Sequence, residues 1–395
     1  MSDTLRQFGP EIQGAIYLRG LSGAKPDIPA NFIGLEAAAK EKMSPEAWAY
    51  TAGAAGLETA MDANRAAFAR HPIAPRMLAG AGQRNLGAEI FGARVAAPVF
   101  SSPIGVLEMM HPDADLAVAR AMARLNLPMV ISSQASFPME EIAKANGDGA
   151  RFFQLYWGRQ DAVAESFVKR AEAIGCRAIF ITLDTLVLGW RPRDLDLGFS
   201  PFLRGQGIAQ YTSDPAFRAL LAQTPEENPL GAAVQFTQIF SDPSLDWKRI
   251  AKIRSWTKLP VVLKGIMRAD DAVKAVSEGY DGIMVSNHGG RQVDGGVGAL
   301  DALPGAVAAA ANARIPVFMD SGVRCGADIF KALALGATAV GVGRPYVYGL
   351  ALAGDQGVQT VMEYLLAELD LLMALNGCPT PANITPSLLS VSQNL

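Results

Sequence analysis

The sequence predicts an α/β protein built on a (β/α)8 TIM barrel, with an N-terminal helical extension and a long loop after strand 4. Two observations predict this fold. From about residue 97, eight short β-rich apolar runs alternate with longer amphipathic stretches of helical periodicity. The runs lack a clean polar and apolar alternation, as expected for strands buried on both faces. An open doubly wound sheet is the second interpretation of this pattern.

The predicted strands are the apolar runs at 97–103, 128–133, 151–155, 177–184, 260–265, 281–287, 316–322 and 339–343. Six of the seven connections hold little more than one helix, which is the rhythm of β-α-β units. The exception is 185–246, a segment rich in Pro, Asp, Phe and Gln. In a barrel this insertion lies over the carboxyl end of the strands, and its length is typical of a lid or of an oligomer contact.

The domain organisation follows from these strands. Residues 1–95 are expected to form a mostly helical extension, and 96–376 form the barrel, with 185–246 as its insertion. A closing helix is expected at 355–376, before a C-terminal tail at 377–395. We expect one domain with appendages and no repeat beyond the β-α unit.

Composition narrows the classes of function. The chain has 35 Lys and Arg against 38 Asp and Glu, a net charge of -3 and a hydrophobic share of 50%, which excludes disorder and gives no electrostatic reason to expect nucleic acid or a membrane surface. Three separated cysteines suggest neither a disulfide framework nor a metal site. Without an apolar leader or a membrane span, the expected location is the cytoplasm and the expected partners are small molecules.

Charged side chains gather where the predicted strands end, the edge at which TIM barrels carry their functional residues. The fourth run ends in Asp184 with Arg191 seven residues on, the fifth ends in Lys264, and the sixth is followed by His288 and Arg291. Each arginine offers a planar fork suited to a carboxylate, although a structural surface arginine is the alternative. The set predicts a site that holds an anion and moves a proton.

His288 is the histidine in the chemical pattern. The other two each precede a proline and are interpreted as structural. His288 follows a buried strand and precedes two glycines, which let a ligand approach the backbone. Asp184 is placed to orient its ring and to stabilise its protonated form, so the pair is interpreted as a general base with its carboxylate partner.

The remaining signals point to a phosphate-bearing ligand. Glycines with Arg324 and Arg344 follow the seventh and eighth strands, the usual phosphate position in a barrel. Lys264 ends an apolar run, so it is interpreted as a counter-charge to a cofactor, with a Schiff-base lysine as the alternative. Polar residues at the ends of other strands are candidates to contact a heteroaromatic ring: Ser132, Gln154, Tyr156 and Thr182.

Together these residues resemble the FMN-dependent L-2-hydroxy acid oxidase family over about residues 30–375. The main string is SNHGGRQVDGG (286–296). It is accompanied, in family order and spacing, by PIG (103–105), FQLYW (153–157), ITLDT (181–185), LKGI (263–266), DSGVR (320–324) and GVGRP (341–345). The resemblance implies FMN as cofactor and a small 2-hydroxy acid as substrate. An isomerase or lyase on the same barrel remains the alternative from another class.

The resemblance also implies roles for individual residues. His288 is the implied base, Asp184 its partner, and Arg191 and Arg291 the binders of the substrate carboxylate. Tyr50 is implied to help hold that carboxylate, Tyr156 to lie near the substrate hydroxyl, and Lys264 to stabilise the reduced flavin at its N1/O2 edge. The flavin is implied to lie against Pro103, Ile104, Gly105, Ser132, Gln154 and Thr182, and its phosphate against Asp320, Gly322, Arg324, Gly343 and Arg344.

Within the family, EIQGAIYLRGLSG, GWRPRD (189–194), PFLRG (201–205) and YTSDPAF (211–217) most resemble lactate 2-monooxygenase. Gly105 stands where simple oxidases of the family carry alanine, beside the flavin N5. The resemblance implies that L-lactate and oxygen yield acetate, carbon dioxide and water. The alternatives are an oxidase that releases keto acid and hydrogen peroxide, or a dehydrogenase with another acceptor. A homo-oligomer, tetramer or octamer, is also implied.

The chain departs from the family pattern at two places. It lacks the acidic residue that family members carry just before Glu58, which leaves the packing near Tyr50 open. Gln134 stands where relatives place an aromatic or aliphatic residue beside the substrate side chain. Its amide either shifts the preference away from lactate or points aside.

Overall fold

The computed structural model describes residues 6–390 and contains a closed barrel of eight parallel strands. The strands are β3 (Val99–Ser101), β4 (Met129–Ile131), β5 (Arg151–Leu155), β6 (Ile179–Thr182), β7 (Val261–Lys264), β8 (Gly282–Val285), β9 (Val317–Met319) and β10 (Ala339–Val342). They pair in chain order, and β10 returns to β3 with Val340 opposite Val99. The predicted TIM barrel is confirmed, and each of its strands lies within one of the eight predicted runs.

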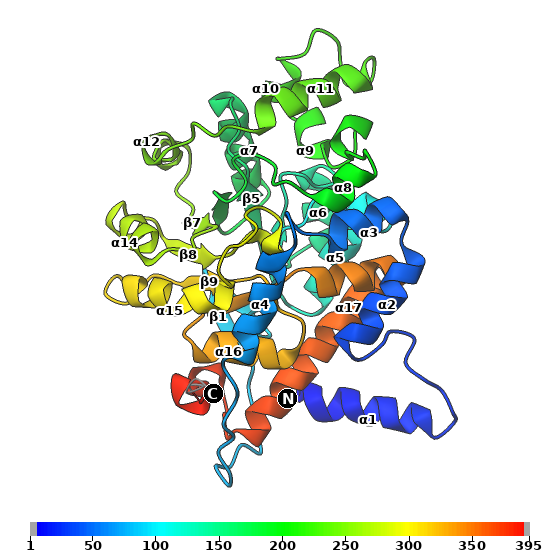
Figure 1. Ribbon diagram of the computed structural model, residues 1–395, viewed down its shortest axis with the longest axis vertical. Helices are drawn as coiled ribbons and strands as arrows, with labels where there is room; N and C mark the ends of the chain where they lie inside the picture. Colours follow the sequence, from blue (N-terminus) through cyan, green and yellow to red (C-terminus); the bar gives the residue numbers. More distant parts are fainter. Residues whose placement is uncertain (1–5, 391–395) are drawn as a thin grey trace.

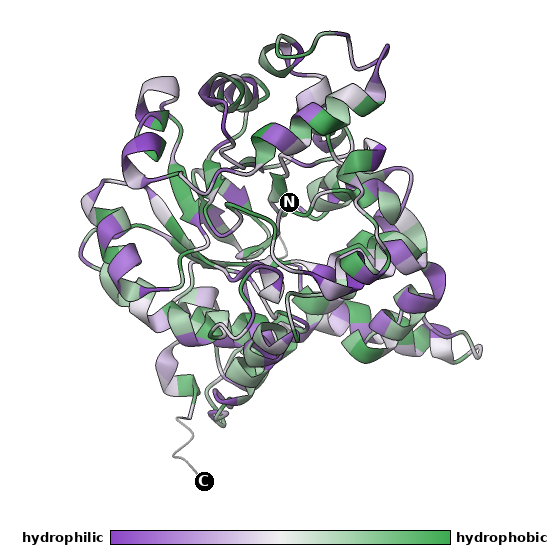
Figure 2. Ribbon diagram, turned by 45° about the horizontal axis from the view of Figure 1, so that its top comes forward, coloured by the Kyte–Doolittle hydropathy of each residue, from purple (hydrophilic) through white to green (hydrophobic). Residues whose placement is uncertain are grey.

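The barrel is filled on both sides of its wall, which explains why its strands lack alternation. Inside, the rings of Phe100, Phe152, Phe180 and Phe318 pack against one another, with centroids 5.5 Å apart for Phe180 and Phe318. Outside, the strands pack against helices, and almost every strand residue is buried. In Figure 2 the central strands are mostly coloured as hydrophobic, and the surrounding helices carry both kinds of residue.

Helices follow the strands and surround the barrel (Figure 1). They are α5 (Ala114–Arg124), α6 (Met139–Asn146), α7 (Asp161–Ala173), α14 (Ala269–Ser277), α15 (Ala299–Ala310), α16 (Gly326–Ala334) and α17 (Arg344–Leu375). The chain bends within α17 at Ala353 and Gly354, where Gly354 has a φ of 57°. Because of this bend, the second half of α17 coincides with the closing helix predicted at 355–376.

The N-terminal extension contains four helices, α1 (Phe8–Gly20), α2 (Phe32–Lys42), α3 (Pro45–Ala52) and α4 (Thr59–Ala69). Helices α1 and α2 pack along α17, and α4 packs against α15 and the turn η3 (His288–Gly290). The buried ion pair of Arg84 and Asp370 anchors the first turn of α1, because Asp370 also accepts a hydrogen bond of 2.8 Å from the Gly9 backbone. This packing brings the end of α3 to the carboxyl end of the barrel.

A short hairpin follows the helices of the N-terminal extension, at a place where the sequence predicts no strand. Strands β1 (Ala88–Ile90) and β2 (Ala93–Val95) are antiparallel, and Phe91 and Gly92 form the turn with φ of 46° and 73°. The Phe91 ring packs against Phe152 and Phe318 and so covers the amino end of the barrel. Two strands of three residues carry too little periodicity to be recognised from sequence.

The insertion 185–246 is a folded layer of short helices, shown in green at the top of Figure 1. It contains α8 (Pro192–Asp196), η2 (Phe202–Arg204), α9 (Ala209–Thr212), α10 (Pro215–Arg218) and α11 (Pro229–Phe240). Buried polar groups fix it to the barrel helices: Gln210 Oε1 accepts from the Met139 backbone at 3.0 Å, and Asp214 accepts from Arg170 at 3.0 Å. Helices α12 (Trp247–Ile250) and α13 (Ile253–Trp256) then lead to β7.

The C-terminal tail continues through two short turns, η4 (Pro381–Asn383) and η5 (Pro386–Leu388). Leu389 forms an isolated antiparallel bridge with Ile73, which ties this tail to the segment after α4. In residues 6–390, no helix combines the length and apolar character needed to cross a membrane. The same residues hold no cluster of three or more His, Cys, Asp or Glu side chains placed to bind a metal ion.

Candidate active site

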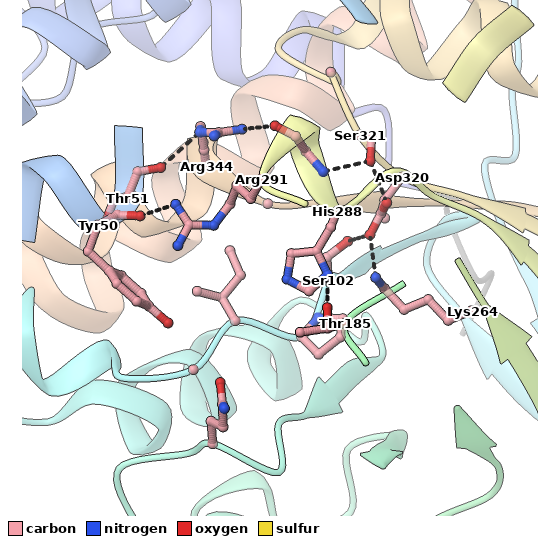
Figure 3. Close-up of a pocket in the computed structure, with 18 of the residues that line it drawn as sticks. Tyr50, Thr51, Ser102, Thr185, Lys264, His288, Arg291, Asp320, Ser321 and Arg344 are labelled. Carbon is pink, nitrogen blue, oxygen red and sulfur yellow. Dashed lines mark hydrogen bonds and ion pairs between the residues drawn. The ribbon is translucent and has the colours of Figure 1, made fainter. Parts of the chain in front are cut away.

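A pocket lies at the carboxyl ends of the barrel strands, where α3 and the start of the insertion meet them. Most of the predicted site residues line it: Tyr50, Pro103, Ile104, Gly105, Tyr156, Arg191, Lys264, His288, Arg291, Asp320, Gly322, Arg324, Gly343 and Arg344. Figure 3 shows two groups, with Tyr50, Thr51, Arg291 and Arg344 on one side and His288, Thr185, Lys264, Ser102, Asp320 and Ser321 on the other.

His288 and Asp184 form a partly buried pair. Nδ1 of His288 lies 2.8 Å from Oδ1 of Asp184. His288 adopts a left-handed φ of 58°, and Gly289 and Gly290 continue the turn with φ of 65° and 81°. A side chain on Gly290 would put Cβ 2.7 Å from the backbone nitrogen of Met61, so only glycine fits this turn. Because Asp184 occupies Nδ1, Nε2 is the ring nitrogen left to meet a ligand.

The electrostatics of the pair favour a neutral histidine beside a charged carboxylate. Burial lowers the pKa of His288, although the charge of Asp184 opposes this effect. The pKa of Asp184 is lowered well below its usual range, because Lys264, His288 and Thr185 together outweigh the cost of burial. A neutral imidazole oriented by a carboxylate is the form in which histidine accepts a proton.

Thr185 is a site residue that the sequence did not single out. Its hydroxyl donates a hydrogen bond of 2.7 Å to Oδ1 of Asp184 and lies 3.2 Å from Nδ1 of His288. The residue also lines the pocket. It is the last residue of the string ITLDT, but a hydroxyl next to an aspartate is too common to indicate a role by itself.

Lys264 ends β7 and lies between two carboxylates. Its Nζ is 3.5 Å from Oδ2 of Asp184 and 4.0 Å from Oδ2 of Asp320, and it donates to the Ser286 hydroxyl at 3.1 Å. Burial lowers its pKa, but Asp184 and Asp320 outweigh that effect and raise the pKa above its ordinary value. A Schiff base needs a neutral amine, so this setting favours the interpretation of Lys264 as a fixed positive charge.

Two arginines form a cationic wall opposite the histidine. The Arg291 guanidinium lies 4.8 Å from the centroid of the Tyr50 ring and donates to the carbonyls of Tyr50 and Gly53. Arg191 donates to the carbonyl of Arg291 at 3.1 Å and to Gln292 Oε1 at 2.7 Å. Burial, followed by the charge of Arg291, lowers the pKa of Arg191 to about 10. Two partly buried cations side by side make this wall a strong site for an anion.

A second cationic cluster contains Arg324 and Arg344. Arg344 begins α17, and its guanidinium donates to the carbonyls of Thr51, Gly53 and Gly289 at 2.8 to 3.1 Å. Burial and then the charge of Arg324 lower its pKa to about 9. Among described residues, the Arg324 guanidinium donates only to the Val323 carbonyl, so most of its N–H donors remain available. Here Arg324 supplies donors and Arg344 mainly supplies charge.

The structure brings Ser132, Gln154 and Thr182 together, but beneath the pocket wall. Gln154 Nε2 donates to the Thr182 hydroxyl at 2.9 Å, and Gln154 Oε1 accepts from the Ser133 backbone at 3.0 Å and from the Ser132 hydroxyl at 3.4 Å. All three are at most 3% exposed. Their predicted contacts with a flavin ring stay predictions, whereas their mutual bonds connect the ends of β4, β5 and β6.

Asp294 resolves the open question about the loop after Tyr50. Its carboxylate accepts hydrogen bonds from the Leu57 backbone at 2.7 Å, the Thr59 hydroxyl at 2.7 Å and the Ala60 backbone at 3.1 Å. Glu58 has a left-handed φ of 64° and accepts from the Ala54 backbone at 3.0 Å. Asp294, from the loop after β8, therefore holds residues 57–60 in place. The chain does not need the acidic residue that family members carry just before Glu58.

The fold and this geometry define a class. A TIM barrel that gathers a histidine-aspartate pair, a buried lysine and two cationic clusters at one edge is built for an anionic substrate and a phosphate-bearing cofactor. The family model described as FMN-dependent dehydrogenase matches residues 39–391, and the chain belongs to that family. Its cofactor is FMN, which suits a pocket where burial lowers the pKa values of Arg324 and Arg344 and so calls for an anion.

Individual relatives agree. The chain is 42% identical to an FMN-dependent alpha-hydroxy acid dehydrogenase, qulF, of Penicillium citrinum, over 91% of this chain and 90% of that protein. It is 40% identical to an L-lactate oxidase of Lysinibacillus sphaericus, over 92% and 93% respectively. A crystal structure of mandelate oxidase with (S)-4-hydroxymandelic acid superposes with a TM-score of 0.81 at 36% identity, covering 92% of this chain and 98% of that one. The predicted family is confirmed.

Proposed function

We propose that the protein oxidises a short L-2-hydroxy acid to the corresponding 2-keto acid, with oxygen as the final electron acceptor. The observation that carries this proposal is the convergence of His288 with Arg191 and Arg291 on one pocket. A site that holds a carboxylate and offers a base suits an acid with its hydroxyl on the adjacent carbon. Relatives named for lactate and hydroxy acids support the same substrate class.

The chain's residues suit distinct tasks in this reaction. Arg291 and Arg191 bind the substrate carboxylate, and the Tyr50 ring packs against the Arg291 guanidinium. This fixes the second carbon of the substrate near His288, whose Nε2 accepts a proton. Asp184 then stabilises the imidazolium at 2.8 Å. Tyr156 lines the same pocket and is proposed to contact the substrate hydroxyl.

When bound, FMN supplies the acceptor for the two electrons that leave the substrate. Arg324, Gly322 and Gly343 are proposed to hold its phosphate, together with the charge of Arg344. Lys264, kept protonated by Asp184 and Asp320, would provide positive charge to stabilise the reduced flavin. The backbone of 103–105, which lines the pocket, is proposed to lie against the ring.

We further propose that the keto acid stays in the pocket while oxygen is reduced, as in a lactate 2-monooxygenase. L-lactate and oxygen then give acetate, carbon dioxide and water. The insertion supports retention, because Leu188 and Arg191 line the pocket and the Gly207 backbone donates to Glu108 Oε1 at 2.7 Å. Gly105 supports it through the family resemblance.

The second candidate is an oxidase that releases keto acid and hydrogen peroxide, and the packing around Gly105 weakens one argument against it. A Cβ on Gly105 would lie 2.6 Å from Cβ of Gln134 and 2.8 Å from its carbonyl oxygen. Packing therefore requires a glycine here whatever the fate of the product. The similarity to an L-lactate oxidase favours the same candidate.

Product analysis separates the two. The FMN-loaded protein is incubated with L-lactate in air, and acetate, pyruvate and hydrogen peroxide are quantified in one sample. A parallel sample contains catalase, because released peroxide decarboxylates pyruvate in solution. Acetate that persists with catalase supports the monooxygenase, and pyruvate with matching peroxide supports the oxidase. A flavin that neither lactate nor other short hydroxy acids reduce would contradict the proposed function.

A cytoplasmic location and a homo-oligomer, tetramer or octamer, stay predictions of this proposal. Light scattering on the FMN-loaded protein measures the mass of the assembly directly against the 41.7 kDa chain. A monomeric mass would contradict the predicted assembly without touching the proposed chemistry.

A further inference from the structure

Gln134 carries an unused amide at the pocket wall. The residue lines the pocket and is 5% exposed, yet its Nε2 has no hydrogen-bond partner in the described part of the chain. The amide of Gln292, at the same edge of the barrel, is fully engaged: its oxygen accepts from Arg191, and its nitrogen donates to the carbonyls of Asp184 and Val187. A buried amide without a partner is costly, and a pocket is where a ligand meets that need.

The backbone and Cβ of Gln134 are held in place at the pocket wall. Its N–H donates to the Ser132 hydroxyl at 3.0 Å, and its carbonyl accepts from the Val106 backbone at 2.9 Å. Its Cβ packs directly against Gly105. A Cβ atom added to that glycine would lie 2.6 Å away. Gly207 of the insertion approaches the same carbonyl from the other side. The amide can therefore adjust to a ligand through the side-chain torsions, while its attachment point stays in place.

The chemistry of an amide limits what it recognises. A half-turn about the last side-chain bond presents either the oxygen or the NH₂ group, and a hydroxyl pairs with both. An alkyl group would cover the amide without forming a hydrogen bond, so the free-energy cost of the unpaired amide would remain. The substrate carboxylate is already accounted for by Arg191 and Arg291, so Gln134 remains for another part of the ligand.

We infer that Gln134 selects 2-hydroxy acids that carry a second hydroxyl on the third carbon, in preference to acids with an alkyl group there. This inference rests on the proposed function and deepens it. The carboxylate binds the arginines, the hydroxyl of the second carbon faces His288, and the hydroxyl of the third carbon pairs with the Gln134 amide. The three contacts together fix the orientation of the substrate.

Two substrates of equal size test the inference. L-glycerate and L-2-hydroxybutyrate have the same number of heavy atoms and differ by a hydroxyl in place of a methyl group. For the FMN-loaded protein we expect kcat/KM for glycerate to exceed that for hydroxybutyrate by about five- to tenfold, the value of one neutral hydrogen bond. Gln134→Met, which keeps the length of the side chain without its amide, is expected to abolish or reverse this preference.

Controls separate recognition from folding and chemistry. The ratio of the two substrates within one protein sample cancels differences in folding and flavin content. Gln160→Met changes an exposed glutamine outside the pocket and is expected to leave the ratio unchanged. In a His288→Ala background, the dissociation constants of the two acids, measured through the flavin absorbance, are expected to show the same preference without turnover.

The outcomes are distinct. A preference for hydroxybutyrate in the wild type, or a ratio that Gln134→Met leaves unchanged, would overturn the inference while the proposed function stands. A flavin that neither of these acids nor lactate reduces would overturn the proposed function itself. Loss of the glycerate preference in Gln134→Met alone would support both.

Discussion

Thr185 donates a hydrogen bond of 2.7 Å to Oδ1 of Asp184, the same oxygen that holds Nδ1 of His288 at 2.8 Å. The other oxygen of Asp184 faces the Lys264 amine at 3.5 Å. One carboxylate thus connects the proposed base on one side with the buried positive charge on the other. The hydroxyl of Thr185 helps to keep that carboxylate ionised and to fix the plane in which it meets the imidazole.

Replacing the proposed base is the most direct test of the site. We expect His288→Ala to slow the anaerobic reduction of the flavin by L-lactate by about 10²- to 10⁴-fold, the usual contribution of a positioned general base. Stopped-flow absorbance measures this rate. The flavin spectrum and content of the variant are the control. Flavin reduction at the wild-type rate would show that His288 is not the base.

The Thr185 hydroxyl is expected to tune the pH dependence of the same step. Without it, the carboxylate of Asp184 holds the imidazolium more strongly, so the pKa of His288 rises. We therefore expect the acidic limb of the kcat/KM profile to move to higher pH in Thr185→Val, because a base works only when unprotonated. Thr185→Ser retains the hydroxyl and is expected to restore the profile. A change in kcat/KM at all pH values without a shift of the limb would indicate a merely structural role.

Much of the site was predictable because a barrel places the ends of all its strands at one edge. Asp184, Lys264 and His288 each lie at the end of a buried run or just after it, so their sequence positions alone brought them together. Side-chain direction was not predictable. Gln154 and Thr182 bond to each other beneath the wall, and the guanidinium of Arg344 binds backbone carbonyls, because local hydrogen bonds decide where such groups point.

Some short elements of the fold could not be predicted from the sequence, because local contacts determine them too. The hairpin of β1 and β2 and the helices α9 and α10 are three or four residues long, below the length at which periodicity is visible. A capping side chain marks the beginning of α10, where Asp214 accepts hydrogen bonds from the backbone N–H groups of Ala216 and Phe217. A single capping aspartate in a polar segment does not distinguish a helix from a turn.

The proposed phosphate site predicts that anions stabilise the protein without its cofactor. Arg344 is buried and Arg324 is partly buried, and burial lowers the pKa values of both, so a bound phosphate relieves an unfavourable concentration of charge. We expect inorganic phosphate at ten times its Kd to stabilise the apoprotein by about 1.4 kcal/mol. The Tm of the apoprotein should rise accordingly. Sodium chloride at equal ionic strength controls for screening. Arg324→Met should remove most of the phosphate effect, and an equal effect of phosphate on that variant would place the anion elsewhere.

Gly105 is predicted to be required by packing. The methyl group of Gly105→Ala would meet Cβ and the carbonyl oxygen of Gln134 below 3 Å, and neither atom is the end of a flexible side chain. We expect the substitution to cost about 1 to 3 kcal/mol of stability in urea unfolding. Gly296→Ala is the matched control, since its methyl meets only the Val293 carbonyl at 3.4 Å. Unchanged stability of Gly105→Ala would mean that the backbone and Cβ of Gln134 shift at little cost to make room for the methyl group.

The buried carboxyl of Asp115 makes a prediction about stability and pH. It accepts a hydrogen bond of 2.8 Å from the Ser136 backbone, and burial, aided by the nearby charge of Glu108, raises its pKa from 3.8 to about 7. In the folded protein the group stays protonated below about pH 7, whereas the unfolded chain releases the proton near pH 4. The stability that this group contributes is therefore fully present below pH 4 and is lost as the pH rises to about 7. The slope approaches about 1.4 kcal/mol per pH unit at most.

Asp115→Asn removes this titration and keeps an oxygen that can accept from Ser136. We expect the free energy of unfolding of the wild type, relative to the variant, to fall between about pH 4 and pH 7 and to level off above that range. Urea unfolding at fixed protein and FMN concentrations measures it, because binding and assembly also shift apparent stability. Asp148→Asn, at an exposed position, is the control and should follow the wild type. Parallel curves for the wild type and Asp115→Asn would show that Asp115 is ionised in the folded protein throughout this range.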